Sequence, residues 1–138
     1  MTAYIDASVL LRVVFGEPRR LSEWGKITRG FSSRLLRVEC LRTIDRARLR
    51  HGLDASVVAE RREAIEDSLR AIDLVPVGQA LARAAEPFPT MLGTLDAIHL
   101  STALLVREID PNVVLTTHDD ELGTAGRAVG LPVIGVGA

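Results

Sequence analysis

Acidic residues occur in this sequence at positions where a carboxylate has uses beyond solubility. Asp6 follows the strand-favouring stretch Ala3-Tyr4-Ile5 and precedes a segment with apolar residues at helical spacing, so we predict a strand that ends at Asp6 and turns into a helix. Open α/β sheets bind ligands at the carboxyl ends of strands, where the strand order reverses. Asp6 is therefore a candidate site residue, although an Asp in this position can also be a simple helix cap.

A second acidic segment follows another predicted strand in the same way. The run Val113 to Thr117 has strand character and leads through His118 into three consecutive acids, after which a helix is expected. Two parallel strands that each end in Asp place both carboxylates at one edge of the sheet. Asp119, Asp120 and Glu121 are all candidates, since each can also serve the helix end, and the position at the strand end favours Asp119.

Glu39 lies within the predicted helix from Arg34 to Arg50, on an apolar stripe that includes Leu36. An acid in the middle of a helix is not a cap, and burying it without a partner would be costly. Glu39 therefore needs a cation, which is either an arginine such as Arg42 or Arg46 or a metal ion.

Asp96 is the only formally charged side chain between Leu95 and Val106, a segment that we expect to be a helix buried on nearly every side. Its place in the first turn also suits a simple interaction with the helix dipole. His99 follows one turn later, and we predict that it is a hydrogen-bonded core residue rather than a ligand.

Together these acids indicate a site for a hard cation. Ligation by several carboxylates, without clustered His or Cys, selects Mg²⁺ or Mn²⁺ over zinc. The sequence lacks the motifs of other phosphate-processing enzymes. No Gly-rich loop with Lys-Ser/Thr is present, and Ser8 stands where an aspartyl-phosphate phosphatase has a second Asp. Cys40 is the only cysteine, which excludes an internal disulfide and a cysteine-built zinc site and fits a reducing cytosol.

Composition is typical of one globular domain, which we predict to span residues 1–138. The chain is 47% hydrophobic, and no linker-like segment divides it. The N-terminus has no basic stretch followed by an apolar run, so we expect neither a signal peptide nor a membrane span and a cytoplasmic location. Few aromatic residues are present, which argues against an extended base-stacking platform.

Strands alternate with helices along the chain, which predicts an α/β fold with a central parallel sheet of about five strands between two helical layers. The segments from Arg34 and from Asp54 are expected to form a helical hairpin joined at Gly52. The further predicted strands are near Gly30 to Ser32, Ile72 to Val75 and Pro132 to Val136, and the further predicted helices are Arg19 to Trp24, Asp54 to Ala71, Gln79 to Ala85, Leu95 to Arg107 and Asp120 to Val129.

Four blocks of this sequence, in order and spread over almost the whole chain, resemble the signature blocks of PIN-domain ribonucleases, specifically VapC toxins of VapBC toxin-antitoxin pairs. The third block is the most specific of the four. The blocks are Tyr4-Ile5-Asp6-Ala7-Ser8, Ser32-Ser33-Arg34-Leu35-Leu36-Arg37-Val38-Glu39, Leu95-Asp96-Ala97-Ile98-His99-Leu100-Ser101-Thr102-Ala103 and Thr117-His118-Asp119-Asp120-Glu121-Leu122.

The resemblance implies a three-layer α/β/α PIN-like fold and a catalytic, metal-binding quartet of Asp6, Glu39, Asp96 and Asp119, with hydroxyls of Ser8 and Thr117 beside it. It also implies Mg²⁺- or Mn²⁺-dependent cleavage of RNA, a homodimer and an inhibitory antitoxin as partner. One departure is Gly93, where many such toxins carry a basic residue. The alternative function is a catalytically inactive PIN-like module that uses the acidic pocket to bind a metal or a partner protein.

Overall fold

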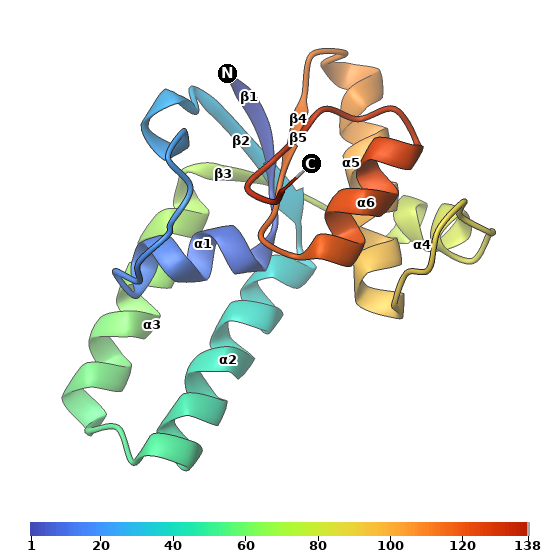
Figure 1. The fold of residues 1–138 in the computed structure, drawn as a ribbon. Coiled ribbons are helices and arrows are strands. Elements are labelled where there is room, and N and C mark those ends of the chain that lie inside the picture. The colour runs from blue at the N-terminus through green and yellow to red at the C-terminus, as the bar shows by residue number, and fades with distance from the viewer. Residues whose placement is uncertain (138) are drawn as a thin grey trace.

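The structure is a computed structural model that describes residues 1–137, so that Ala138, the last residue of the predicted domain, lies outside the described residues. Within that range, strands and helices alternate along the chain (Figure 1). The elements are β1 (Thr2–Ile5), α1 (Ala7–Val14), the short 3-10 helix η1 (Trp24–Lys26), β2 (Arg29–Ser33), α2 (Leu35–His51), α3 (Ala55–Arg70), β3 (Ile72–Val75), α4 (Gly78–Ala84), α5 (Thr94–Ile109), β4 (Val114–Thr116), α6 (Asp120–Ala128) and β5 (Val133–Ile134).

The five strands form one parallel sheet in the order β3-β2-β1-β4-β5. β1 occupies the centre, with β2 and then β3 on one side and β4 and then β5 on the other. The strand order therefore reverses at β1, and the turns after β1 and β4 lie next to each other at the same sheet edge. The predicted parallel sheet is confirmed.

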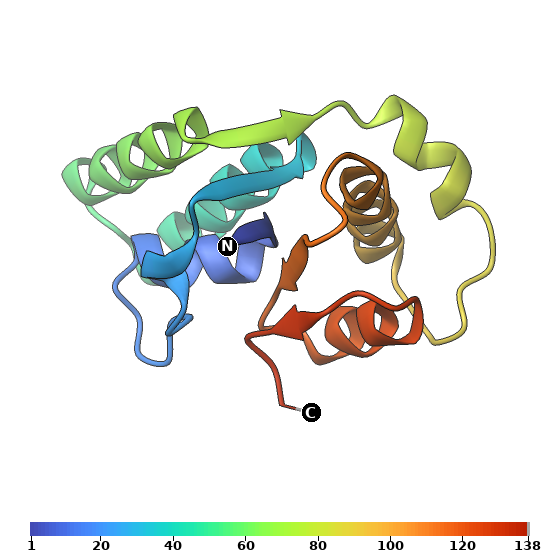
Figure 2. The same ribbon diagram turned by 90° about the horizontal axis from the view of Figure 1, so that it is seen from above.

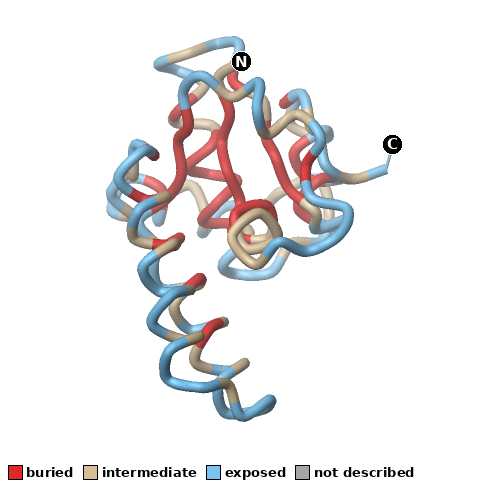
Figure 3. The backbone as a smooth tube through the Cα atoms, turned by 90° about the vertical axis from the view of Figure 1, so that its left-hand side faces the viewer, coloured by how far each residue is buried: buried red, intermediate tan, exposed pale blue. Residues whose placement is uncertain are grey.

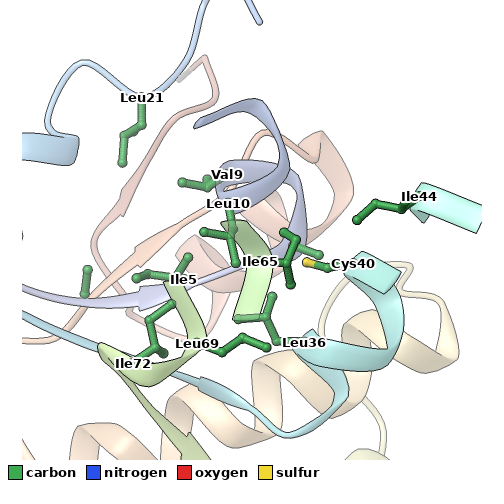
Figure 4. Packing of buried hydrophobic residues seen from close by; sticks show 12 residues of the cluster. Ile5, Val9, Leu10, Leu21, Leu36, Cys40, Ile44, Ile65, Leu69 and Ile72 are labelled. Carbon is green, nitrogen blue, oxygen red and sulfur yellow. The ribbon is translucent and has the colours of Figure 1, made fainter. Parts of the chain in front are cut away.

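Two hydrophobic cores lie on opposite faces of this sheet, because successive strand side chains point to opposite sides. Ala3 and Ile5 of β1 belong to the core under α1, α2 and α3, in which Leu36, Cys40 and Ile65 also pack (Figure 4). Tyr4 lies in the other core, with residues of α5 and α6. Figure 2 shows the two helical groups on either side of the strands, which confirms the predicted three-layer α/β/α architecture.

The predicted helical hairpin is present and consists of α2 and α3, joined at Gly52, whose φ of 60° is a left-handed conformation that glycine adopts readily. Its far end extends beyond the sheet and is mostly exposed, whereas the buried residues gather near the strands (Figures 1 and 3). Arg37 of α2 pairs with Glu66 of α3 at 2.8 Å.

Two predicted elements differ in the structure. The helix predicted from Arg19 to Trp24 is wrong, because Arg19 has a left-handed φ of 59° just after Pro18, and only the 3-10 helix η1 follows. The edge strand β5 is shorter than predicted. Gly135 has a φ of 101°, which ends the extended backbone, and a Cβ there would lie 2.3 Å from the carbonyl oxygen of Thr117.

Membrane-spanning helices are absent from residues 1–137, since none of the helices described is both long and apolar enough to cross a bilayer.

Candidate active site

Asp6 lies at the carboxyl end of the central strand and immediately before α1. Its side chain does not cap that helix, so the simple capping interpretation does not describe it. Asp6 is 5% exposed, and its Oδ2 accepts hydrogen bonds from Ser8 Oγ at 2.6 Å and Thr117 Oγ1 at 2.9 Å. Because both hydroxyls donate to the same oxygen, Oδ1 stays available to a ligand.

The turns that follow β1 and β4 are connected by hydrogen bonds. Ser8 Oγ, which donates to Asp6, accepts the backbone N–H of His118 at 2.9 Å. Thr117 Oγ1, which also donates to Asp6, accepts the N–H of Asp119 at 3.0 Å. The two hydroxyls therefore fix the second turn relative to the first.

Asp119 is the N-cap residue of α6, and its Oδ1 accepts the N–H of Leu122 at 2.8 Å. Capping and a site role are compatible, since one carboxylate oxygen serves the helix and the other remains. Asp120 and Glu121 are exposed and line a separate groove with Thr90. The charge of Asp119, rather than that of either neighbour, is among those that act on Asp96.

Glu39 has a side-chain partner that the sequence analysis did not name. No ion pair joins it to an arginine within residues 1–137, because Arg42 pairs with Asp45 and Arg46 donates to Thr43. Instead, Glu39 Oε1 hydrogen-bonds to Nε2 of His99, across from α2 to α5. Of the two alternatives for Glu39, a salt bridge to a neighbouring arginine is therefore not the one that the structure has.

His99 is fully buried, as predicted for a core histidine, and its Nδ1 lies 2.7 Å from the hydroxyl of Tyr4. Burial is the largest single influence on its pKa and lowers it. The hydrogen bond and charge of Glu39, together with the charges of Asp6 and Asp96, outweigh burial and raise the pKa of His99 above its ordinary value.

Asp96 lies in the first turn of α5, and the other acids affect its pKa. Its pKa is raised to about 6, first by burial and then by the negative charges of Asp119, Asp6 and Glu39, which outweigh the opposing effect of His99. Acids from α2, α5 and the ends of β1 and β4 therefore act on one another at one edge of the sheet.

Whether the four acids fit a cation follows from their donor atoms and their charge. Within residues 1–137, no three Asp, Glu, His or Cys side chains are close enough to enclose one ion as they stand. Mg²⁺, however, retains several waters and is commonly held by one or two carboxylates. A group of carboxylates that repel one another fits such a partly hydrated hard cation.

Comparison with known proteins identifies the fold family. The family model described as "PIN domain" matches residues 3–127. This chain belongs to the PIN domain family. This PIN domain is also similar to the proteins named "Ribonuclease VapC35" from Mycobacterium tuberculosis strains CDC 1551 / Oshkosh and H37Rv, with 28% identity over 140 residues that cover 97% of this chain and 96% of each relative.

One feature of this PIN domain was not evident from the sequence, namely the chain of contacts from Tyr4 through His99 to Glu39. Tyr4 sits 95 positions from His99, so no local spacing connects the two residues. The available signal was His99 itself, a titratable residue in a segment otherwise almost without charge. Glu39 also lines a groove of about 260 Å³, together with Val38, Leu95, Arg42 and Arg46.

Proposed function

We propose that this PIN domain is a Mg²⁺- or Mn²⁺-dependent endoribonuclease that hydrolyses RNA phosphodiester bonds and acts in the cytoplasm as the toxin of a toxin-antitoxin pair. Its catalytic, metal-binding residues are Asp6, Glu39, Asp96 and Asp119. Similarity to proteins named Ribonuclease VapC35 over nearly the whole of both chains supports RNA as substrate and the toxin role.

The observation that carries this proposal is the electrostatic coupling at the switch point of the sheet. The pKa of Asp96 is raised by burial and by three other carboxylates from separate segments of the chain. A fold gains nothing in stability from gathering like charges where they are partly buried, whereas a bound cation would compensate them.

The four acids have different tasks in this mechanism. Asp6, held by two hydroxyls, supplies a fixed oxygen to the group of acids. Asp96 and Asp119 contribute further negative charge, and the phosphodiester is proposed to bind beside these acids. When bound, a divalent ion supplies Lewis-acid activation of the phosphate and lowers the pKa of a bound water.

A carboxylate that is less directly engaged with the ion can accept the proton of the attacking water. Glu39 and Asp119 are the two candidates for this general base, and each keeps one carboxylate oxygen outside its hydrogen bond to His99 or Leu122. Cys40 is not a competing nucleophile. Burial, and then the charges of Glu39 and Asp6, raise the pKa of its thiol to about 12, so it remains protonated.

Cleavage of labelled RNA by the purified protein, free of any partner, tests the proposed function. Wild type is expected to cleave with Mn²⁺, to stop when a chelator is added, and to lose cleavage in Asp96→Asn. Asp54→Asn, at an exposed helix N-cap far along the hairpin, is the matched control and is expected to cleave like wild type. Cleavage that persists in chelator would contradict the metal-dependent mechanism.

An antitoxin and a second copy of the chain are the proposed protein partners. The antitoxin is proposed to dock on the charged hairpin formed by α2 and α3. Arg61 stacks over the ring of Phe15 at 4.6 Å and therefore also serves the fold, whereas Arg62 is exposed. Charge reversal at Arg62 is expected to weaken complex formation, and unchanged binding would contradict docking there.

A non-catalytic binding module remains the second candidate. The observation that favours it is the spacing of the acids, since no three of the described side chains enclose an ion as they stand. Such a module would bind Mn²⁺ or an arginine of its partner but would leave RNA intact. Mn²⁺ binding without RNA cleavage, in wild type free of partner, would favour the module over the nuclease.

A further inference from the structure

His99 lies between a tyrosine of the core and one of the four candidate site acids. It is fully buried in α5, and each of its ring nitrogens has a partner from a different segment of the chain. On the core side the partner is the hydroxyl of Tyr4 in β1, at 2.7 Å from Nδ1. On the other side of the ring the partner is Oε1 of Glu39 in α2.

The hydrogen-bond network determines which nitrogen carries the proton in the neutral ring. Burial, the largest influence, raises the pKa of Tyr4 far above its ordinary value, so the phenol keeps its proton and can donate it to Nδ1. The Glu39 carboxylate can only accept a hydrogen bond, so the proton of the neutral ring lies on Nε2, the nitrogen that faces it. In that tautomer Tyr4 O–H donates to Nδ1 of His99, and His99 Nε2–H donates to Glu39.

This arrangement also limits how Glu39 can turn. The hydrogen bond to His99 uses Oε1, while the side chain of Glu39 is 22% exposed and lines the groove that Arg42 and Arg46 also line. A carboxylate held at one oxygen by a buried donor presents the other oxygen outward in a fixed direction. Removal of the donor would leave Glu39 free to rotate or to pair with Arg42 or Arg46, which line the same groove.

We propose that His99, with Tyr4 behind it, is a positioning residue that aims the Glu39 carboxylate at the metal site. This inference rests on the proposed function, because it assigns a role toward the cation that the four acids would hold. A hydrogen-bonded partner behind a metal-binding carboxylate typically contributes 10- to 100-fold to metal affinity or activity. A purely structural histidine would contribute to folding alone.

The test compares His99→Leu, His99→Gln and Tyr4→Phe with wild type. Gln places an amide N–H near the position of Nε2 and can still donate to Glu39, whereas Leu fills the space without a donor. Ser101→Ala is the matched control, since Ser101 is equally buried in α5 and its hydroxyl has no hydrogen-bond partner among the described residues. The measurements are the Mn²⁺ dissociation constant by calorimetry, RNA cleavage, and the His99 ring tautomer by ¹⁵N NMR without metal.

We expect the wild-type ring to carry a proton on Nε2, and His99→Leu to weaken Mn²⁺ binding about 10- to 100-fold. His99→Gln should recover most of that affinity, and Ser101→Ala should stay within about twofold of wild type. If His99→Leu does not fold, Tyr4→Phe replaces it in the test. For Tyr4→Phe we expect a smaller loss of Mn²⁺ affinity and a His99 ring that also populates the Nδ1–H tautomer.

Unchanged Mn²⁺ affinity in folded His99→Leu, or a wild-type ring protonated only on Nδ1, would overturn the positioning role. Mn²⁺ affinity that follows the expected series while wild type leaves RNA intact would contradict the nuclease and support His99 positioning. Absence of Mn²⁺ binding by wild type would overturn both the metal-dependent nuclease and the positioning role of His99.

Discussion

The turns after β1 and β4 share a local pattern, with a strand, an Asp and then a helix, yet their acids have different surroundings. Asp6 is almost fully buried, does not cap its helix and is held by hydroxyls from both turns. Asp119 is exposed and caps α6 through Leu122. The pattern therefore specifies where an acid lies, while residues that are distant in sequence specify what its side chain contacts.

The difference has a physical basis in the sheet order. β1 is central and its end is covered by the neighbouring turn, so Asp6 must find donors within the protein. α6 begins directly after Asp119, and the first N–H groups of that helix need an acceptor. We therefore expect substitution of Asp6 to affect RNA cleavage, and substitution of Asp119 to affect both Mn²⁺ binding and the stability of the fold.

Asp6→Asn is the substitution with the largest expected effect. Loss of the fixed central carboxylate should reduce Mn²⁺-dependent RNA cleavage by at least about 100-fold, equivalent to about 2.7 kcal/mol. The melting temperature in chelator should not fall, because one of several mutually repelling charges is removed. Initial cleavage rates and thermal unfolding check both statements, and a cleavage loss below about tenfold would contradict the central role of Asp6.

Thr117→Val should have the next largest effect, since it removes the hydroxyl that joins the two turns. Thr117 donates to Asp6 and accepts from the N–H of Asp119, so both contacts are lost together. We expect a decrease of about 10- to 100-fold in cleavage and a destabilisation of about 1–3 kcal/mol. Thr117→Ser keeps the hydroxyl and serves as control. If the Val and Ser variants unfold in denaturant and cleave RNA alike, the Thr117 hydroxyl does not join the two turns as proposed.

At Asp119, a pair of substitutions separates capping from charge. Asn is as good a cap as Asp, so Asp119→Asn should keep stability in chelator while it weakens Mn²⁺ binding. Asp119→Ala should lose the cap as well, at a cost of about 1 kcal/mol in unfolding free energy. Asp120→Asn is the control, and an effect on Mn²⁺ binding as large as that of Asp119→Asn would reassign the site acid.

A smaller effect is expected on the pH dependence of stability without metal. The folded-state pKa of Asp96 is about 6, above the ordinary value of 3.8, so the folded protein binds this proton more tightly than the unfolded chain. The contribution to stability is fully present below about pH 3.8 and is lost as pH rises through about 6.

Asp96→Asn has no such proton to lose. Its stability in chelator, relative to wild type, should therefore increase between about pH 4 and 7. Thermal unfolding of both proteins across this range measures the difference. A wild type that gains stability relative to Asp96→Asn as pH rises would contradict the mutual repulsion of the acids.

Sequence patterns were sufficient to predict most of the fold. Local signals such as Gly52 at the hairpin and the strand Ile72–Val75 are decided by neighbouring residues, and the structure has both. The predicted helix from Arg19 failed because helical composition there is overridden by the left-handed backbone of Arg19. The length of β5 depends on Gly135 meeting Thr117, a contact across the sheet that no local window contains.

The same limit applies to the candidate site. The positions of the four acids followed from strand ends and helix faces, but the partner of Glu39 did not. Neighbouring arginines are within reach of Glu39 along α2, yet the packing of α5 brings His99 onto it from 60 positions away. Hydrogen bonds between distant segments depend on how the layers pack, and a single sequence carries no direct record of them.

Thermal unfolding of wild type and Asp96→Asn, each with chelator and with Mn²⁺, tests the central claim that the four acids form one metal site. At a hundredfold excess of Mn²⁺ over its dissociation constant, wild type should gain about 2.7 kcal/mol of stability. Asp96→Asn should lose most of that gain while it remains at least as stable as wild type in chelator. An equal Mn²⁺ shift in both proteins, or no shift in either, would contradict the claim.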